Sequence, residues 1–179
     1  MRVITGTARG RRLITPNGLE TRPTSDKVKE GLFSAIQFDI EGRRILDLFA
    51  GSGQMGIEAL SRGADSAIFV DNSKAAIYTI EENIRSCGFK DKASVYNTDY
   101  KSFLMANKNT FDIVFLDPPY KAGILEDAIK SVIPFLSDYA IIIAEHPHDL
   151  ILEDEICGFT ATKKYKYSKT AATVFRRKD

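Results

Sequence analysis

The stretch "DLFAGSGQMG", residues 47–56, decides the fold, because it carries the spacing G-x-G-x-x-G at Gly51, Gly53 and Gly56. An apolar run at 44–49 leads into it, and a helical pattern follows. Strand, glycine turn and helix in this order form the fingerprint of a Rossmann-like unit. Glycines in such a turn let the backbone adopt positive φ and approach a nucleoside ligand closely.

Strands and helices alternate outward from this turn. Apolar runs predict strands at 44–49, 66–71, 93–98, 111–117 and 139–146, and helical periodicity predicts helices within 22–36, 54–63, 73–88 and 123–136. The run at 111–117 is almost continuously apolar, which is typical of a strand covered on both faces. Alternation of this kind indicates right-handed crossovers and a parallel sheet.

Both ends of the chain depart from the alternating pattern. Two short β-prone runs, 1–6 and 11–16, predict an N-terminal hairpin, and the pattern of 158–177 predicts two antiparallel strands. We therefore expect an α/β protein with a mostly parallel, seven-stranded sheet and an antiparallel terminal strand. Residues 1–22 would be a basic β-hairpin extension, and 23–179 would be a Rossmann-like domain of the S-adenosylmethionine (SAM)-dependent methyltransferase type.

Acidic residues near the strand ends favour SAM over a dinucleotide. Asp71 ends the second strand, where a carboxylate can bind ribose hydroxyls of either cofactor. Asp47, beside the turn, suits a cationic ligand and not a diphosphate, and Asp99 could bind an adenine amino group. The chain is also short for a dehydrogenase, which usually needs a second half and a substrate domain.

The motif "DPPY", Asp117 to Tyr120, directly follows the fourth strand and predicts the chemistry. The prolines remove two backbone donors, so the Asp117 carboxylate and the Pro118 carbonyl are left as acceptors. Together they suit an exocyclic NH₂ group on a nucleobase, and Tyr120 can stack on that base. The sequence thus predicts transfer of a methyl group rather than a hydride, catalysed by positioning and electrostatics.

Charge is segregated along a chain of nearly neutral net charge, +1. Residues 1–22 contain five arginines and one acid, residues 160–179 contain seven basic residues and one acid, and the middle is acidic. Such segregation is typical of a protein that binds a polyanion.

Other features of the composition exclude several classes of protein. No apolar run reaches about 18 residues and the N-terminus lacks a signal-peptide pattern, so we expect a cytoplasmic protein that spans no membrane. Cys87 and Cys157 are isolated, and the pair His146 and His148 lacks further ligands, so no metal site is expected.

Four segments together resemble one family: "RVITGTARGRRL", "RPTSDKVKEGLF", "DLFAGSGQMGIEALSRGA" and "DIVFLDPPY". They are similar to the bacterial RsmD family, whose members methylate the N2 amino group of one guanine in small-subunit (16S) ribosomal RNA. The resemblance runs from residue 2 to the closing strands. The departures are small: Gln54 and Met55 stand where smaller residues are common, and Tyr120 stands where some members have Phe.

The resemblance implies three groups of site residues. The SAM pocket would be lined by Asp47, Phe49, Ala50, Gly51, Gly53, Asp71, Asn72, Asp99, Tyr100 and Asp117. The target guanine would be held by Asp117, Pro118, Pro119 and Tyr120. RNA phosphates would be contacted by Arg2, Arg9, Arg11, Arg12 and Arg22.

The expected partner is 16S rRNA, within an assembled or assembling small subunit, and the expected oligomeric state is a monomer. Two alternatives stay open from the residues alone. A DNA adenine-N6 methyltransferase would use the same "DPPY", and a protein or small-molecule amine methyltransferase would use the same cofactor turn.

Overall fold

The computed structural model describes residues 1–16, 26–120, 123–167 and 169–178. Its strands are β1 (Arg44–Asp47), β2 (Ser66–Asp71), β3 (Ala93–Asn97), β4 (Phe111–Leu116), β5 (Leu136–Pro147), β6 (Glu155–Ile156), β7 (Phe159–Lys166) and β8 (Thr170–Arg177). Its α-helices are α1 (Asp26–Ala35), α2 (Gln54–Ser61), α3 (Lys74–Cys87), α4 (Tyr100–Ala106) and α5 (Ile124–Val132). Short 3₁₀ turns lie at Lys90–Lys92 and Ile133–Phe135.

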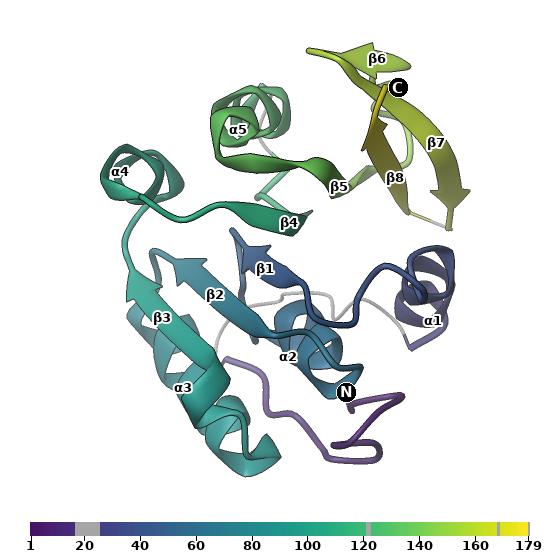
Figure 1. The fold of residues 1–179 in the computed structure, drawn as a ribbon. Coiled ribbons are helices and arrows are strands. Elements are labelled where there is room, and N and C mark those ends of the chain that lie inside the picture. Colours follow the sequence, from purple (N-terminus) through teal and green to yellow (C-terminus); the bar gives the residue numbers. More distant parts are fainter. Residues whose placement is uncertain (17–25, 121–122, 168, 179) are drawn as a thin grey trace.

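All eight of these strands form one twisted sheet in the order β3-β2-β1-β4-β5-β8-β7-β6 (Figure 1). The first five are parallel to one another, whereas β8, β7 and β6 pair antiparallel. The Rossmann-like fold is therefore confirmed, with two corrections. The sheet has eight strands because the two-residue β6 adds an edge, and the C-terminal strand β8 lies inside the sheet rather than at its end.

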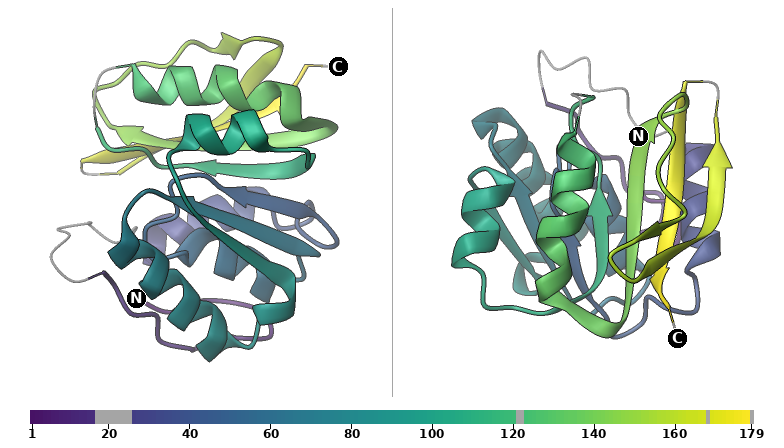
Figure 2. Two further views of the ribbon diagram at one scale, coloured as in Figure 1. Left: turned by 90° about the vertical axis from the view of Figure 1, so that its left-hand side faces the viewer. Right: turned by 90° about the horizontal axis from the view of Figure 1, so that it is seen from above.

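Helices cover both faces of the sheet (Figure 2). One apolar core joins α1, α2 and α3 to the first face, and a second core joins α4 and α5 to the other. Within the first core, Gly56 on α2 lies against Phe69 on β2 so closely that a Cβ on Gly56 would come within 2.3 Å of the ring. The third glycine of the fingerprint therefore sets the distance between helix and sheet.

The predicted N-terminal hairpin is reduced to a single antiparallel bridge, between Arg2 and Arg12. This segment packs against α2 instead of extending as two strands: Thr7 N–H donates to the Ser61 carbonyl at 2.8 Å, and the side chains of Val3 and Leu13 are buried in the first core. Hydrogen bonds to α2 satisfy backbone groups of this segment that would otherwise pair between the two strands of a longer hairpin. Residues 22–25, at the start of the helix predicted within 22–36, lie outside the described residues.

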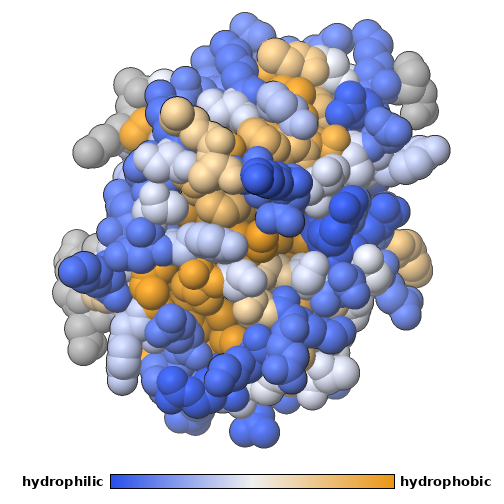
Figure 3. Space-filling model, turned by 60° about the vertical axis from the view of Figure 1, so that its left-hand side comes forward, coloured by the Kyte–Doolittle hydropathy of each residue, from blue (hydrophilic) through white to orange (hydrophobic). Residues whose placement is uncertain are grey.

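Figure 3 brings the β3 side of the molecule forward, and apolar surface gathers in the middle of this face between hydrophilic areas. A shallow cavity of about 280 Å³ lies against α3 and β3, and its lining comprises Glu81, Ile84, Arg85, Lys90, Ala93 and Val95. These residues belong to the C-terminal half of α3, the 3₁₀ turn at Lys90–Lys92 and the first residues of β3, so the cavity lies away from the carboxyl ends of the strands. In the described parts of the chain, no helix is long and apolar enough to cross a membrane.

Candidate functional site

The glycine turn connects β1 to α2 at the carboxyl edge of the sheet. Gly51 has φ +56° and Gly53 has φ +76°, which are left-handed conformations that favour glycine. A Cβ built on Gly51 would meet no atom within 4 Å, so open space lies over the turn. The turn can therefore accept a ligand directly against its backbone.

Asp47 lies under this turn as a buried carboxyl group. Its residue is 4% exposed, and Oδ2 accepts the Gly56 N–H at 3.0 Å, at the start of α2. Burial, with a further contribution from the charge of Asp71, raises the pKa of Asp47 to about 7. A ligand that brings positive charge to the turn would stabilise the ionised form, which is a property expected of SAM and not of a diphosphate.

Asp71 holds the glycine turn and the start of α3 together. One carboxylate oxygen accepts the Gly51 N–H at 2.9 Å, and the other accepts the Ser73 N–H at 2.8 Å. The residue is only half-buried, so each oxygen keeps lone pairs for a further donor such as a ribose hydroxyl. The neighbouring Asn72 is exposed, and Ala50 is tied into the sheet edge by its N–H, which donates to the Val70 carbonyl at 3.0 Å.

Asp99 has a structural role that the sequence did not indicate, because it caps α4. Its carboxylate accepts the Lys101 and Ser102 N–H groups at 3.0 Å and the Ser102 hydroxyl at 2.6 Å. These bonds, led by the one from the Ser102 hydroxyl, lower the pKa of Asp99. The residue is exposed at the carboxyl edge, so an ionised acceptor is available there.

An aromatic pair lies between the glycine turn and α4. The rings of Phe49 and Tyr100 have centroids 5.2 Å apart at 49°. The Tyr100 hydroxyl donates to Asp127 on α5 at 2.6 Å, and burial followed by this bond raises the pKa of Tyr100 to about 12. Tyr100 is therefore fixed as a neutral ring, which is suited to packing against a nucleobase.

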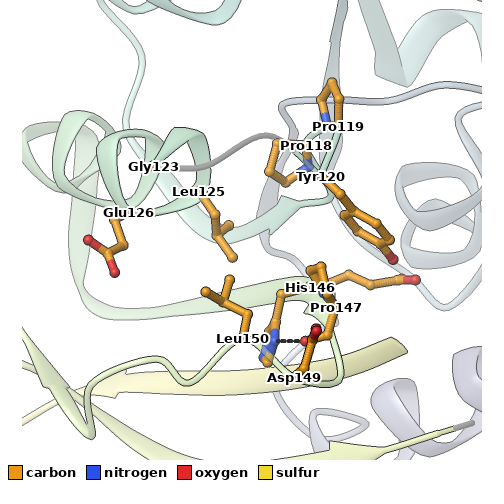
Figure 4. Close-up of a pocket in the computed structure, with 11 residues that line it drawn as sticks. Pro118, Pro119, Tyr120, Gly123, Leu125, Glu126, His146, Pro147, Asp149 and Leu150 are labelled. Atoms are coloured by element: carbon orange, nitrogen blue, oxygen red, sulfur yellow. Dashed lines mark hydrogen bonds between the residues drawn. The ribbon is translucent and has the colours of Figure 1, made fainter. Parts of the chain in front are cut away.

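The "DPPY" residues follow β4, all six residues of which are buried. They border a cavity of about 290 Å³ (Figure 4) whose lining comprises Pro118, Pro119, Tyr120, Gly123, Leu125, Glu126, Glu145, His146, Pro147, Asp149 and Leu150. Tyr120 lines this cavity and is 57% exposed, and its ring lies opposite Pro147 in the view shown. The ring is thus in position to stack on a planar group that enters.

Three carboxyl groups come together on neighbouring strands at this edge: Asp47 at the end of β1, Asp117 after β4 and Glu145 near the end of β5. Asp117 is open to solvent on one side, yet lost hydration, followed by the negative charges of Glu145 and Asp47, raises its pKa. Sequence reasoning missed Glu145. Its only signal was its position late in the fifth strand, and its closeness to Asp117 depends on strand register.

His146, beside Glu145, is fully used by the fold. Its Nδ1 lies 2.9 Å from the Pro147 carbonyl and its Nε2 lies 3.0 Å from the Thr173 hydroxyl. Because a carbonyl only accepts, Nδ1 carries the proton and Nε2 accepts from Thr173. Burial lowers the pKa of His146, which keeps the ring neutral. Among the residues described, no group of three or more His, Cys, Asp or Glu could hold a metal ion.

The structure places two of the predicted RNA-binding arginines, Arg9 and Arg11, away from the "DPPY" edge. Arg9 and Arg11 are exposed and follow Thr7 closely in the chain. The Thr7 N–H donates to the carbonyl of Ser61, the last residue of α2. Because α2 starts at the carboxyl edge, its end lies at the opposite one. Arg2 pairs with Asp26 on α1 at 3.2 Å, Arg12 is exposed, and Arg22 lies outside the described residues.

Comparison with known proteins identifies the family of the chain. Residues 1–176 match the family model described as "Conserved hypothetical protein 95". "Ribosomal RNA small subunit methyltransferase D" of Haemophilus influenzae is 37% identical to the chain, with 93% of each covered. The protein of that name in Escherichia coli K12 is 37% identical over 81% of this chain and 74% of its own length. YlbH of Bacillus subtilis, a candidate rRNA methyltransferase, is 38% identical over 99% of this chain and all of its own.

Solved structures agree with these relatives. The fold of yhhF of E. coli, a candidate methyltransferase, superposes with a TM-score of 0.89 at 33% identity, covering 99% of this chain and 98% of that one. A Streptococcus mutans protein crystallised with SAH, at 16% identity and a TM-score of 0.70, shares the fold over 84% of this chain and 48% of its own. The matched length, the identity and the motifs agree: the chain belongs to the RsmD family, the family of ribosomal RNA small subunit methyltransferase D.

Proposed function

We propose that the protein transfers a methyl group from SAM to the N2 amino group of a guanine in 16S ribosomal RNA. The observation that carries this proposal is the "DPPY" edge. There Pro118, which follows Asp117 directly, lines a cavity, and the exposed residue Tyr120 lines the same cavity. The names of the relatives, which refer to small-subunit rRNA, favour the same class of substrate.

The residues at the glycine turn fit SAM. Open space over Gly51 leaves room for a ligand against the backbone, and buried Asp47 would be stabilised in its ionised form by a cation. We assign the ribose to Asp71 and the adenine to Asp99, Phe49 and Tyr100. When bound, SAM would supply an electrophilic methyl group, and the sulfur would keep the electron pair of the C–S bond.

At the target base, the chain acts by holding the amino group. The Asp117 carboxylate and the Pro118 carbonyl accept one N2 proton each, which turns the nitrogen lone pair away from the ring and toward the cofactor. Tyr120 stacks on the base and fixes its plane. Methylated N2 then loses a proton to water, because its acidity makes a dedicated base unnecessary.

The exposed arginines Arg2, Arg9, Arg11 and Arg12 would contact RNA phosphates, and so would Arg22. Such contacts supply affinity that depends on salt but do not read sequence. Because Arg9 and Arg11 lie far along the surface from the cavity, they would bind phosphates at a distance from the target base. An extended footprint of this kind favours an assembled or assembling small subunit as substrate. The enzyme would then act as a monomer in the cytoplasm.

The test is methyl transfer from labelled SAM to unmethylated small subunits, to naked rRNA and to DNA, with products digested to nucleosides. N2-methylguanosine from RNA is the expected product, and the better RNA substrate identifies whether assembly matters. N6-methyladenosine from DNA would overturn the substrate while retaining the amino-group chemistry. Methylation of a protein or small amine alone would overturn the nucleic acid assignment.

A further inference from the structure

Glu145 and Asp117 are lateral neighbours at the carboxyl edge. β4 and β5 are parallel and in register through the pair Leu116 and Ala144, so the next residues along the two strands are Asp117 and Glu145. Leu116 and Ala144 both pack into the core under α5, and since side chains alternate, Asp117 and Glu145 share the opposite face. Neighbouring strands lie about 4.8 Å apart, which spaces the two carboxyl groups closely.

Glu145 combines burial with access to the cavity. The residue is 9% exposed, yet it contributes to the lining of the cavity that Tyr120 also lines. Its charge acts on the Asp117 carboxyl more strongly than that of Asp47 does. A carboxylate in this setting is a strong acceptor for a donor that enters the cavity, because such hydrogen bonds are charge-assisted.

Guanine and adenine differ in what they present to two adjacent acceptors. Next to the N2 amino group, guanine carries an N1–H donor. Next to the N6 amino group of adenine, N1 is an acceptor. The "DPPY" acceptors contact only the amino group, so they do not distinguish the bases. A second carboxylate beside Asp117 does, because it would attract guanine N1–H and repel adenine N1.

We propose that the carboxylate of Glu145 accepts the N1–H of the target guanine and so selects guanine at the site. This proposal rests on the proposed function. Asp117 and Pro118 hold N2, and Glu145 extends the row of acceptors by one position along the base edge. A base with an acceptor at N1 would bring its lone pair against the negative charge of this carboxylate, so it is rejected even when its amino group fits.

The test compares guanine with 2-aminopurine at the methylated position of the RNA. 2-Aminopurine keeps the amino group but has an acceptor at N1 and lacks O6. Wild-type enzyme should prefer guanine in kcat/KM by roughly 100-fold or more. Glu145→Gln, whose amide can donate to N1, should lower this preference about tenfold or more. It should reduce kcat/KM for RNA with guanine and leave kcat/KM for RNA with 2-aminopurine nearly unchanged. Glu126→Gln, at another acid of the cavity lining, should leave the ratio unchanged.

Further measurements separate selection from other roles. 6-Thioguanine, which keeps N1–H but alters position 6, should remain a good substrate of the wild type. SAM affinity of Glu145→Gln should match that of the wild type, and Glu145→Asp, which keeps the carboxylate, should keep the preference for guanine. The role of Glu145 would be overturned if Glu145→Gln lowered kcat/KM equally for guanine and 2-aminopurine, or if the wild type methylated both bases equally well. Absence of N2-methylguanosine with wild-type enzyme would instead overturn the proposed function.

Discussion

Lys29 on α1 and Glu58 on α2 form an ion pair in which neither side chain is exposed, with 3.4 Å between Nζ and Oε2. Lys29 also donates to the Arg2 carbonyl at 2.6 Å, and Glu58 accepts the N–H groups of Ile4 and Thr5. The pair therefore fixes the arginine-rich segment to two helices at once. Burial lowers the pKa of Lys29, against the attraction of Glu58.

Glu58→Gln should destabilise the protein by about 3–5 kcal/mol, because it leaves the Lys29 charge buried without its anion. The free energy of unfolding from urea titrations measures this loss. A matched surface change, Glu155→Gln, removes an exposed pair with Lys178 and should cost less than about 1 kcal/mol. Equal effects of the two substitutions would contradict a structural role for the buried pair.

Asp117→Ala should abolish methyl transfer while SAM still binds, because the Asp117 carboxylate holds the target amino group, whereas the backbone of the glycine turn and Asp71 would provide most of the contacts to the cofactor. The expected loss in kcat is about 10²–10³-fold or more, as when one electrostatic contact to a reacting group is removed. Single-turnover rates and SAM titration by calorimetry measure the two effects separately. A parallel loss of SAM affinity would mean that Asp117 acts chiefly in the cofactor site.

Tyr120→Phe should be mild, since the ring and not the hydroxyl is proposed to stack. Tyr120→Ala removes a base–aromatic contact of about 1–3 kcal/mol and should slow transfer accordingly. Tyr120→Asp should be the most damaging, because it puts a negative charge beside Asp117. Rates on RNA for the three variants give the order, and an inactive Tyr120→Phe would show that the hydroxyl takes part.

Affinity for SAM should rise with pH through about 7, because the pKa of Asp47 is raised to about 7 and its ionised form attracts the cationic ligand. The stability of the free protein should change in the opposite direction. Because the pKa of Asp47 is higher in the folded state than its unfolded value of 3.8, this carboxyl group contributes to stability below pH 3.8, and the contribution is lost as the pH rises toward 7. Titration at pH 6 and 8 checks the first effect, and Asp47→Asn should flatten it. S-adenosylhomocysteine, which lacks the sulfonium charge, should respond less.

Replacing Arg9, Arg11 and Arg12 by Gln should weaken RNA binding and reduce the slope of log affinity against log salt by up to about 3, one unit for each phosphate that an arginine no longer neutralises. SAM affinity should be nearly unchanged, because all three side chains are exposed and Arg9 and Arg11 lie away from the glycine turn. Filter binding at several salt concentrations measures the slope. An equal loss of SAM affinity would indicate that the segment is only structural.

The local sequence was enough to predict the glycine turn, the "DPPY" edge and the parallel strands, since these depend on short-range patterns. It did not predict α4, because the seven-residue helix begins at Tyr100 with no periodic run to mark it and is fixed by the cap at Asp99. It also missed Glu145, whose position next to Asp117 depends on pairing between strands about thirty residues apart. The arginines were predicted by charge alone, which gives no position on the surface.

The interior position of β8 has a consequence for truncated forms of the chain. The last residues pair with β5 from Ile141 to Pro147, where β5 carries three consecutive isoleucines that are all buried. A chain that ended before Thr170 would leave this long apolar strand as an open edge, without charges or proline along the isoleucine run to block pairing with other molecules. Proteolysis or early termination of translation that removed only this last strand would thus turn the enzyme into an aggregation-prone form.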